Sequence, residues 1–282
     1  MSVVELLKVI VQGIVEGFTE WLPISSTGHM LLVDEIIQMD QPEAFLNVFF
    51  VVIQLGAILA VVLLYYERLN PFSRRKKLAA RNATIVLWLK IIWACVPAAV
   101  FGLLLNDWMD AHLKNPFVIS AMLIIYGVLF ILLENRNRRV DFTIQKTGQI
   151  SFQTAFYIGL FQLLSLVPGT SRSGATILGA MLLGCSRSAA AEFSFFLGIP
   201  VMFGASLLKI VVFFVKGNMF TFPQVIYLLL GMVVAFLVSV YSIKFLMGYI
   251  RSHDFKFFGY YRIVLGIIVI AYFGITALAV PV

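Results

Sequence analysis

The sequence predicts an all-α polytopic membrane protein with six transmembrane helices and two re-entrant helical hairpins, arranged as an inverted-topology repeat. Of its 282 residues, 61% are apolar and only 12% are charged, whereas about 25% of the residues of a typical soluble domain are charged. Long uncharged runs account for most of this composition, and two further apolar segments contain polar interruptions. A soluble protein of this size would expose too much apolar surface, so we expect the chain to lie within a membrane.

Six segments are long and apolar enough to cross a bilayer as helices, which takes about 20 residues each. The predicted spans are residues 44–66, 83–106, 116–134, 190–215, 223–248 and 261–280. Single lysines, Lys90 and Lys209, interrupt two of the long apolar runs. We treat the chain as one membrane domain, residues 1–282.

Basic residues are concentrated in alternate loops, which predicts the orientation of the spans. Residues 67–85, residues 135–150 and the segment holding Arg251, Lys256 and Arg262 are rich in Lys and Arg, whereas residues 106–115 and 216–222 are poor in them. An excess of Lys and Arg marks the cytoplasmic side. The net charge of +7 is therefore expected to face cytosol and anionic bilayer lipids, and we expect no nucleic-acid partner.

Two apolar segments contain polar breaks and fit poorly as simple spans. Residues 9–37 are interrupted from Glu16 to His29, and residues 152–186 from Pro168 to Gly174. The alternation of basic loops fails if these segments cross the membrane and holds if each enters and returns on one side. Non-helical backbone at that depth persists only when it is buried in protein or lines a wet cavity, so we predict two re-entrant hairpins.

The two halves of the chain then have the same order, a hairpin followed by three spans. Residues 9–135 form the first copy and residues 152–280 the second. Three spans per copy is an odd number, so the second copy is predicted to be inverted, with the first hairpin entering from outside and the second from the cytoplasm. Inverted repeats place their site near the midplane, where broken helices meet.

Glu16 and Glu20 lie four residues apart, which places both carboxylates on one helical face. Placing each carboxylate inside a membrane costs about 2.5–3.5 kcal/mol, so we expect both side chains to have a function. Hard oxygen ligands suit Mg²⁺ or Ca²⁺, with phosphate oxygens completing the shell. We predict a divalent-cation site, with a hydrated interface as the alternative.

Hydroxyl groups follow in the same break, at Ser25, Ser26 and Thr27, next to His29. An alcohol becomes a useful nucleophile when a neighbouring base takes its proton, so this run predicts a nucleophile and a base. The alternative is a helix cap followed by a core histidine.

The second break combines glycines and small hydroxyl residues with one arginine. Ser171, Ser173 and Thr176 surround Arg172, and such a run before a helix leaves backbone N–H groups free to hold an anion. The guanidinium fits phosphate oxygens. The alternative is a structural ion pair of Arg172 with Glu16, Glu20 or Glu192.

Carboxylates for a metal, a hydroxyl, an imidazole and an arginine-bearing anion cradle together suit phosphoryl transfer. Because these groups lie in apolar segments, the substrate is expected to carry a lipid tail.

At these motifs the chain resembles the undecaprenyl-diphosphate phosphatase family, also called bacitracin-resistance proteins. The resemblance is carried by Glu16-Gly17-Phe18-Thr19-Glu20-Trp21-Leu22-Pro23-Ile24-Ser25-Ser26-Thr27-Gly28-His29, by Pro168-Gly169-Thr170-Ser171-Arg172-Ser173-Gly174-Ala175-Thr176, and by the shorter runs Val52-Ile53-Gln54-Leu55-Gly56 and Glu192-Phe193-Ser194-Phe195.

The resemblance implies an enzyme of the bacterial inner (plasma) membrane that hydrolyses a polyprenyl diphosphate and regenerates the monophosphate carrier of peptidoglycan synthesis. It implies dependence on a divalent cation, a site open to the outer face and a homodimer as one assembly state. Bacitracin would compete by sequestering the substrate.

By position, the resemblance assigns roles to the break residues. Glu16 and Glu20 match the metal and catalytic acids, Ser26 the nucleophile and His29 the essential histidine. Ser171, Arg172, Ser173 and Thr176 match the diphosphate pocket, to which Ser25 and Thr27 are added by their place in the first break. In the expected mechanism the metal and Arg172 neutralise the diphosphate, His29 takes the proton of Ser26, and Ser26 attacks the terminal phosphorus. The lipid monophosphate leaves, and water then hydrolyses the phosphoserine. Attack by His29 or by metal-bound water remains open.

Two other classes of membrane protein share some of these features. A second class of membrane phosphatase requires histidine six residues after Ser-Arg, and Leu178 stands there, which argues against it. A lipid-carrier flippase would use the same architecture, and release of phosphate without a gradient distinguishes the two.

Overall fold

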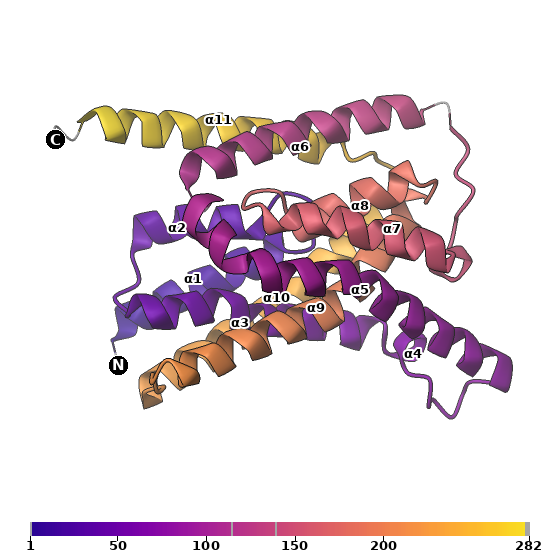
Figure 1. Cartoon of the computed structure of the whole chain (residues 1–282), viewed down its shortest axis with the longest axis horizontal. Helices are drawn as coiled ribbons and strands as arrows, with labels where there is room; N and C mark the ends of the chain where they lie inside the picture. The colour runs from indigo at the N-terminus through magenta and orange to yellow at the C-terminus, as the bar shows by residue number, and fades with distance from the viewer. Residues whose placement is uncertain (1, 114, 139, 280–282) are drawn as a thin grey trace.

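The computed structural model describes residues 2–113, 115–138 and 140–279, and Figure 1 shows a bundle of helices. The helices in chain order are α1 (Val3–Thr19), α2 (Ser26–Ile37), α3 (Glu43–Leu64), α4 (Tyr66–Leu69), α5 (Leu78–Leu113), α6 (Pro116–Asn137), α7 (Phe152–Leu163), α8 (Arg172–Leu182), α9 (Arg187–Val215), α10 (Phe222–Tyr249) and α11 (Lys256–Ala279). Two short 3₁₀ segments, η1 (Thr147–Gln149) and η2 (Leu164–Leu166), lie beside α7.

Six of the described helices, α3, α5, α6, α9, α10 and α11, are long and apolar enough to cross a membrane. This confirms the predicted class, an all-α polytopic membrane protein. The helix α5 is longer than the span predicted at residues 83–106, because it begins within the basic segment and continues to Leu113. Residue 280 of the last predicted span lies outside the described residues.

The two segments with polar breaks each form a pair of helices joined by a short non-helical stretch. In the first pair α1 packs against α2, and in the second α7 packs against α8. The first helix of each pair packs on a long helix of the other half, α1 on α10 and α7 on α5. The pairs α3 with α9 and α6 with α11 each join one half to the other. Figure 1 shows α6 and α11 side by side along one flank of the molecule.

Glycines allow the helix backbones of these pairs to approach closely. A Cβ atom on Gly56 of α3 would lie 2.0 Å from the carbonyl oxygen of Met232 in α10. A Cβ atom on Gly159 of α7 would lie 2.1 Å from that of Ala94 in α5. Close approach at small residues is a common basis of helix association in membranes, where the hydrophobic effect does not drive one helix onto another.

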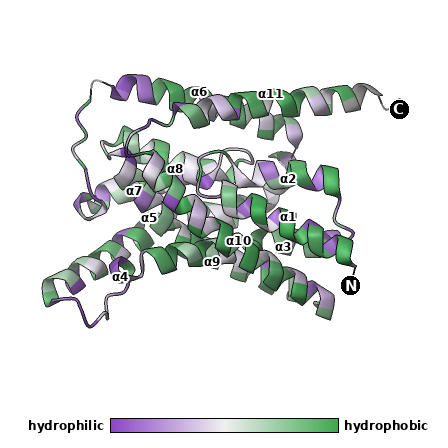
Figure 2. Cartoon of the chain, turned by 180° about the vertical axis from the view of Figure 1, so that it is seen from behind, coloured by the Kyte–Doolittle hydropathy of each residue, from purple (hydrophilic) through white to green (hydrophobic). Residues whose placement is uncertain are grey.

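Hydrophobic residues dominate the long helices, and hydrophilic residues lie at the loops, at helix ends and among the central helices (Figure 2). Exposed side chains such as Leu207, Leu229 and Leu237 suit contact with lipid rather than water. This distribution is the reverse of a soluble bundle and agrees with the membrane class.

Ion pairs hold the helix ends on the side of the basic loops. Arg187 of α9 donates two hydrogen bonds, of 2.8 and 2.5 Å, to the buried carboxylate of Glu134 in α6. The backbone N–H of Phe255 donates to the same carboxylate at 3.0 Å. Arg68 pairs with Glu192 and donates to Thr147 at 2.9 Å. These contacts join α6, α9 and the start of α11, and tie α4 to α9 and η1.

One basic residue lies elsewhere than the sequence indicated. Arg262 was expected in the loop before the last span, yet it is fully buried within α11. The helix begins six residues earlier, at Lys256, so the polar segment was assigned too far along the chain. Of the three basic residues assigned to this loop, Arg251 lies before α11 and Lys256 is its first residue.

Candidate active site

The two helix breaks end in the same unusual cap. Ser25 precedes α2 and Ser171 precedes α8, and both have a backbone φ of 74°. Each side-chain oxygen accepts a hydrogen bond from a backbone N–H three residues on, that of Gly28 at 3.4 Å and of Gly174 at 3.1 Å. A positive φ at a non-glycine residue costs about 1–3 kcal/mol and occurs most often at functional sites. The breaks are therefore built alike, and both direct a helix N-terminus toward the interior.

The carboxylate of Glu20 joins the two breaks. Its Oε1 accepts hydrogen bonds from Arg172 Nη2 at 3.0 Å and from Arg172 Nε at 3.3 Å. Its Oε2 accepts from the hydroxyl of Ser26 at 2.5 Å. Ser173 of the second break donates to the backbone oxygen of Glu20 at 3.0 Å. Residues about 150 positions apart in the chain thus form one buried cluster of carboxylate, hydroxyl and guanidinium.

Arg172 is also held from α9. Its Nη1 donates to the backbone oxygen of Ser194 at 2.7 Å. The hydroxyls of Thr176 and Ser194 share a hydrogen bond of 2.6 Å, and Thr176 donates to the backbone of Arg172 at 2.9 Å. The guanidinium is therefore fixed in direction. Glu192, the third carboxylate considered for it, pairs with Arg68 instead.

Glu16 lies fully buried, one turn before Glu20 on α1. Neither of its carboxylate oxygens has a hydrogen-bond partner among the described residues, and the side-chain oxygen of Gln12 has none either. Glu20 and Arg172 are the charged groups that act on it. A buried carboxylate without a partner is costly, and a divalent cation would satisfy both oxygens.

The donor set fits a cation bound jointly by protein and substrate. Among the described residues no group of three or more His, Cys, Asp or Glu side chains is arranged as a metal site. Glu16 offers two oxygens, and Glu20 has both of its oxygens engaged by Arg172 and Ser26. Hard cations such as Mg²⁺ commonly take one or two carboxylates and fill the remaining positions with water and phosphate oxygens.

Among the described residues, the hydrogen bonds of the His29 ring lead away from Ser26. Its Nδ1 lies 2.7 Å from the backbone oxygen of Ser25, and its Nε2 lies 2.7 Å from the hydroxyl of Tyr261 in α11. Both ring nitrogens are thus engaged away from the serine that His29 was expected to deprotonate. The group in contact with the Ser26 hydroxyl is Glu20.

The remaining hydroxyl groups lie around the cluster. Ser25 and Ser171 act as helix caps, and the hydroxyl of Ser171 lies 3.1 Å from that of Ser173. Thr27 is exposed beside the first break. The structure therefore brings together Glu20, Ser26, Arg172, Ser173 and Thr176, and places Thr27 and His29 at the margin.

Sequence reasoning missed the role of Arg262 in this site. Its guanidinium donates to the backbone oxygens of Pro23, Gly169 and Thr170, each at 2.9 Å. It also donates to Leu123 and Met122 of α6, at 3.4 Å each, and lies 5.4 Å from the ring centre of Tyr126. One buried arginine therefore ties both breaks to the α6–α11 pair. The signal in the sequence was Arg262 itself, an arginine that lies directly before the apolar run of the last predicted span.

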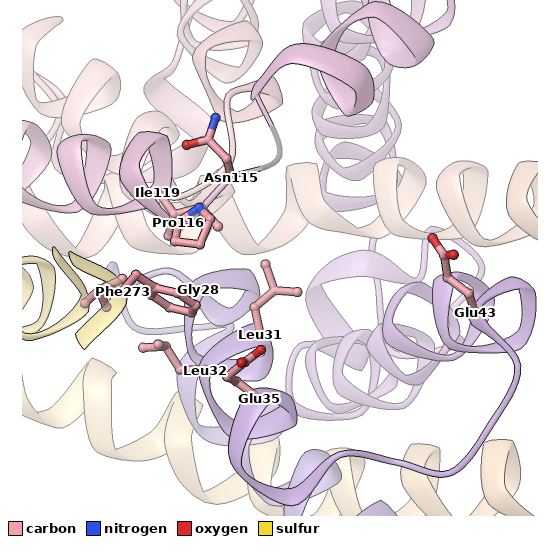
Figure 3. A pocket seen from close by; sticks show the side chains of 10 residues that line it. Gly28, Leu31, Leu32, Glu35, Glu43, Asn115, Pro116, Ile119 and Phe273 are labelled. Atoms are coloured by element: carbon pink, nitrogen blue, oxygen red, sulfur yellow. The ribbon is translucent and has the colours of Figure 1, made fainter. Parts of the chain in front are cut away.

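A pocket of about 290 Å³ adjoins the first break. Figure 3 shows it between α2, the start of α6 and α11, with Gly28 in its wall and Glu35 and Glu43 at its margin. Its other lining residues are mostly apolar, namely Leu31, Leu32, Pro116, Ile119, Val269 and Phe273, with Asn115 as the one further polar residue.

Fold and site together define a class, a polytopic α-helical membrane protein with a buried cluster of carboxylate, hydroxyl and guanidinium groups at two helix breaks. The chain belongs to the family described as bacitracin resistance protein BacA, whose model matches residues 9–268. A protein of Streptococcus thermophilus named undecaprenyl-diphosphatase is 58% identical over 270 residues, covering 96% of this chain and 94% of the relative. Proteins of the same name from Desulfitobacterium hafniense and Enterococcus faecalis are 58% and 57% identical, and cover 97% and 96% of this chain and 98% of each relative.

Proposed function

We propose that this protein is an undecaprenyl-diphosphate phosphatase. It hydrolyses the diphosphate to undecaprenyl phosphate and inorganic phosphate, and so regenerates the carrier used in peptidoglycan synthesis. The relatives named above carry this activity in their names. The observation that carries the proposal is the contact chain Ser26–Glu20–Arg172, which holds a hydroxyl, a proton acceptor and a phosphate-binding group together.

The proposed reaction has two steps. In the first, Glu20 takes the proton of Ser26, and the serine oxygen forms a bond to the terminal phosphorus while the bond from that phosphorus to the bridging oxygen breaks. The lipid monophosphate leaves, and Ser26 carries the phosphoryl group. In the second, Glu20 returns its proton to the oxygen of Ser26 as the bond from that oxygen to phosphorus breaks, while water attacks the same phosphorus and leaves with its protons as inorganic phosphate. Arg172 and the N–H groups of the two breaks hold the phosphate oxygens.

This assignment changes one expectation. His29 was expected to take the proton of Ser26, and the 2.5 Å contact supports Glu20 in that role. A bound Mg²⁺ or Ca²⁺, held by Glu16 and Glu20, would supply charge neutralisation for the phosphate oxygens. Attack by His29 is disfavoured by its two hydrogen bonds elsewhere.

The substrate is proposed to lie with its diphosphate at the breaks and its first isoprene units in the pocket beside Gly28. The apolar lining of that pocket supports this arrangement. Asn115, which also lines this pocket, ends the segment 106–115 that is poor in Lys and Arg and is predicted to lie outside. The ion pairs of Arg187 and Arg68 lie at the other, basic end of the molecule. We therefore infer a bacterial plasma-membrane enzyme whose site opens to the outer face. Bacitracin would act by sequestering its substrate, and a homodimer stays a prediction.

The test is phosphate release by the purified protein in detergent, where no gradient can drive transport. Ser26→Ala is expected to lower turnover at least about 10³-fold, as loss of a catalytic nucleophile does elsewhere, while a labelled diphosphate lipid still binds. Ser252→Ala, in a loop next to exposed His253, is the matched control and should match the parent protein. Near-normal turnover of Ser26→Ala would exclude the serine route, and absence of phosphate release from the parent protein would favour a flippase.

A further inference from the structure

The two hydrogen bonds of His29 determine which ring nitrogen carries the proton. A backbone carbonyl only accepts, so the contact of Nδ1 with the oxygen of Ser25 at 2.7 Å requires a proton on Nδ1. In a neutral imidazole Nε2 is then an acceptor, and its partner at 2.7 Å is the hydroxyl of Tyr261. The two rings are nearly parallel, with 5° between their planes. Tyr261 thus favours the tautomer in which His29 donates to Ser25.

This donation acts on the cap that orients the proposed nucleophile. Ser25 has a φ of 74° and directly precedes Ser26. Its backbone oxygen receives both the ring N–H of His29 and the backbone N–H of His29, at 2.7 and 3.2 Å. The ring therefore fixes the peptide from which the Ser26 side chain projects.

The second break forms the same type of cap without a histidine ring donating to the serine carbonyl. Ser171 has the same φ of 74° and the same type of cap, and its backbone oxygen accepts from the backbone N–H of Ala175 at 2.9 Å. Ala175 stands four residues after Ser171, as His29 stands four after Ser25. A cap of this geometry thus forms with alanine at that position. The contact of His29 with Tyr261 is thus made at the cap next to the proposed nucleophile, Ser26, whereas Ala175 stands at the corresponding position of the other cap.

We propose that Tyr261 is a positioning residue that acts through His29 on the Ser25–Ser26 peptide. The proposal rests on the proposed function, since it assumes that Ser26 attacks the substrate. In it, His29 holds the serine in place and Glu20 takes its proton. Tyr261 and the neighbouring Arg262 then make α11 a part of the active site, although that helix lies outside both hairpins.

The tautomer is measured by nitrogen NMR on protein labelled with ¹⁵N-histidine. His112→Gln and His253→Gln leave His29 as the only histidine. The expected spectrum at neutral pH shows a neutral ring with its proton on Nδ1, and Tyr261→Phe should shift it toward a mixture of tautomers. A ring protonated on Nε2 in the parent protein would overturn the proposal. This measurement keeps Tyr261, so it remains decisive if Tyr261→Phe fails to fold.

A second experiment measures the steady-state kinetics of phosphate release. Tyr261→Phe is expected to lower kcat about three- to tenfold, the usual effect of one hydrogen bond, with KM changed less than about twofold. The exposed neighbour Tyr260 provides the control Tyr260→Phe, which should not change kcat. Equal kcat values for Tyr261→Phe and Tyr260→Phe would overturn the proposal.

Replacement of the histidine separates positioning from proton transfer. The amide of His29→Asn retains a donor near the Nδ1 position but cannot titrate, whereas His29→Ala has no donor. We expect His29→Asn to keep clearly more activity than His29→Ala. If both are equally inactive, His29 itself takes part in proton transfer and the proposal fails. If Ser26→Ala is active, the serine route of the proposed function fails instead, and the tautomer measurement still reports on Tyr261.

Discussion

Glu20 has different partners at its two oxygens, and this has consequences for substrate binding. Arg172 contacts Oε1 and the Ser26 hydroxyl contacts Oε2. A diphosphate competes with Glu20 for the guanidinium, because arginine binds phosphate oxygens through paired, charge-assisted hydrogen bonds. Loss of the Arg172 contact frees Oε1 of Glu20 for another partner, such as a cation. Substrate binding would therefore leave Oε2 in contact with the Ser26 hydroxyl and make Oε1 available as a ligand.

Glu16 is expected to contribute to cation binding rather than to proton transfer. In Glu16→Gln the charge of the buried, unpartnered carboxylate is lost and the side-chain shape is kept. The cation concentration for half-maximal phosphate release should rise at least about tenfold, a typical loss at a disturbed metal site. Glu35→Gln, at the margin of the pocket, is the control. An unchanged cation dependence in Glu16→Gln would show that Glu16 is no ligand.

Arg262 is expected to affect both stability and activity. Arg262→Met would leave the carbonyl oxygens of Pro23, Gly169 and Thr170 without their donor, and each buried unsatisfied group costs about 1–3 kcal/mol. We expect a lower midpoint of thermal unfolding and little phosphate release, even though Ser26, Glu20 and Arg172 are intact. Arg251→Met, at an exposed arginine, should leave both unchanged. Parent-like values for Arg262→Met would contradict this role.

The helices α2 and α8 bring their N-termini to the site because each follows a break with the same cap. Free N–H groups and the positive end of the helix dipole favour an anion at such a terminus. Under the proposed function, two of them close to Arg172 would hold the diphosphate. The short helices α1 and α7 on the other side of each break support this geometry through α10 and α5.

Close helix packing at Gly56 is open to a direct test. Gly56→Ala places a Cβ atom 2.0 Å from the Met232 carbonyl oxygen, so α3 and α10 must separate. Overpacking of this kind typically costs about 1–3 kcal/mol, and the midpoint of thermal unfolding in detergent should fall. Gly204 of α9 has no atom within 4 Å of the position of its Cβ, so Gly204→Ala should be neutral or slightly stabilising. Equal effects of the two variants would argue against the α3–α10 contact.

The two ends of the bundle differ, because ion pairs join the helices at one end and a pocket lies between the helices at the other. At the basic end, the pairs Arg187–Glu134 and Arg68–Glu192 join neighbouring helices. At the other end, the pocket beside Gly28 lies between α2, α6 and α11. This difference is the physical basis of the proposed outward-facing site.

Orientation in the membrane is tested by cysteine labelling of intact cells. The starting variant carries Cys95→Ala and Cys185→Ala, which removes both cysteines of the chain. A cysteine introduced by Glu35→Cys should react with a membrane-impermeant maleimide from outside. One introduced by Arg75→Cys, at a highly exposed side chain of the basic loop, should react only after permeabilisation. The opposite pattern would reverse the proposed orientation.

The amino-acid sequence alone determined the class of fold and the positions of the polar breaks. Lipid tolerates few charges and no unpaired backbone, so apolar runs, basic loops and interruptions such as Glu16–His29 are direct local signals. The residue types in the breaks also predicted phosphate chemistry, because carboxylate, hydroxyl and guanidinium have few other uses at that depth.

The tertiary structure alone decided which of these groups are partners. Glu20 rather than His29 contacts Ser26, His29 is directed toward Tyr261, and Arg262 leaves its expected loop to join both breaks. The physical reason is that most of these contacts link positions far apart in the chain, 232 residues for His29 with Tyr261 and 239 for Arg262 with Pro23, while the contact of Glu20 with Ser26 depends on the non-helical path of the break between them. Their distances depend on how α1, α8 and α11 pack, and no local pattern in the chain carries that information.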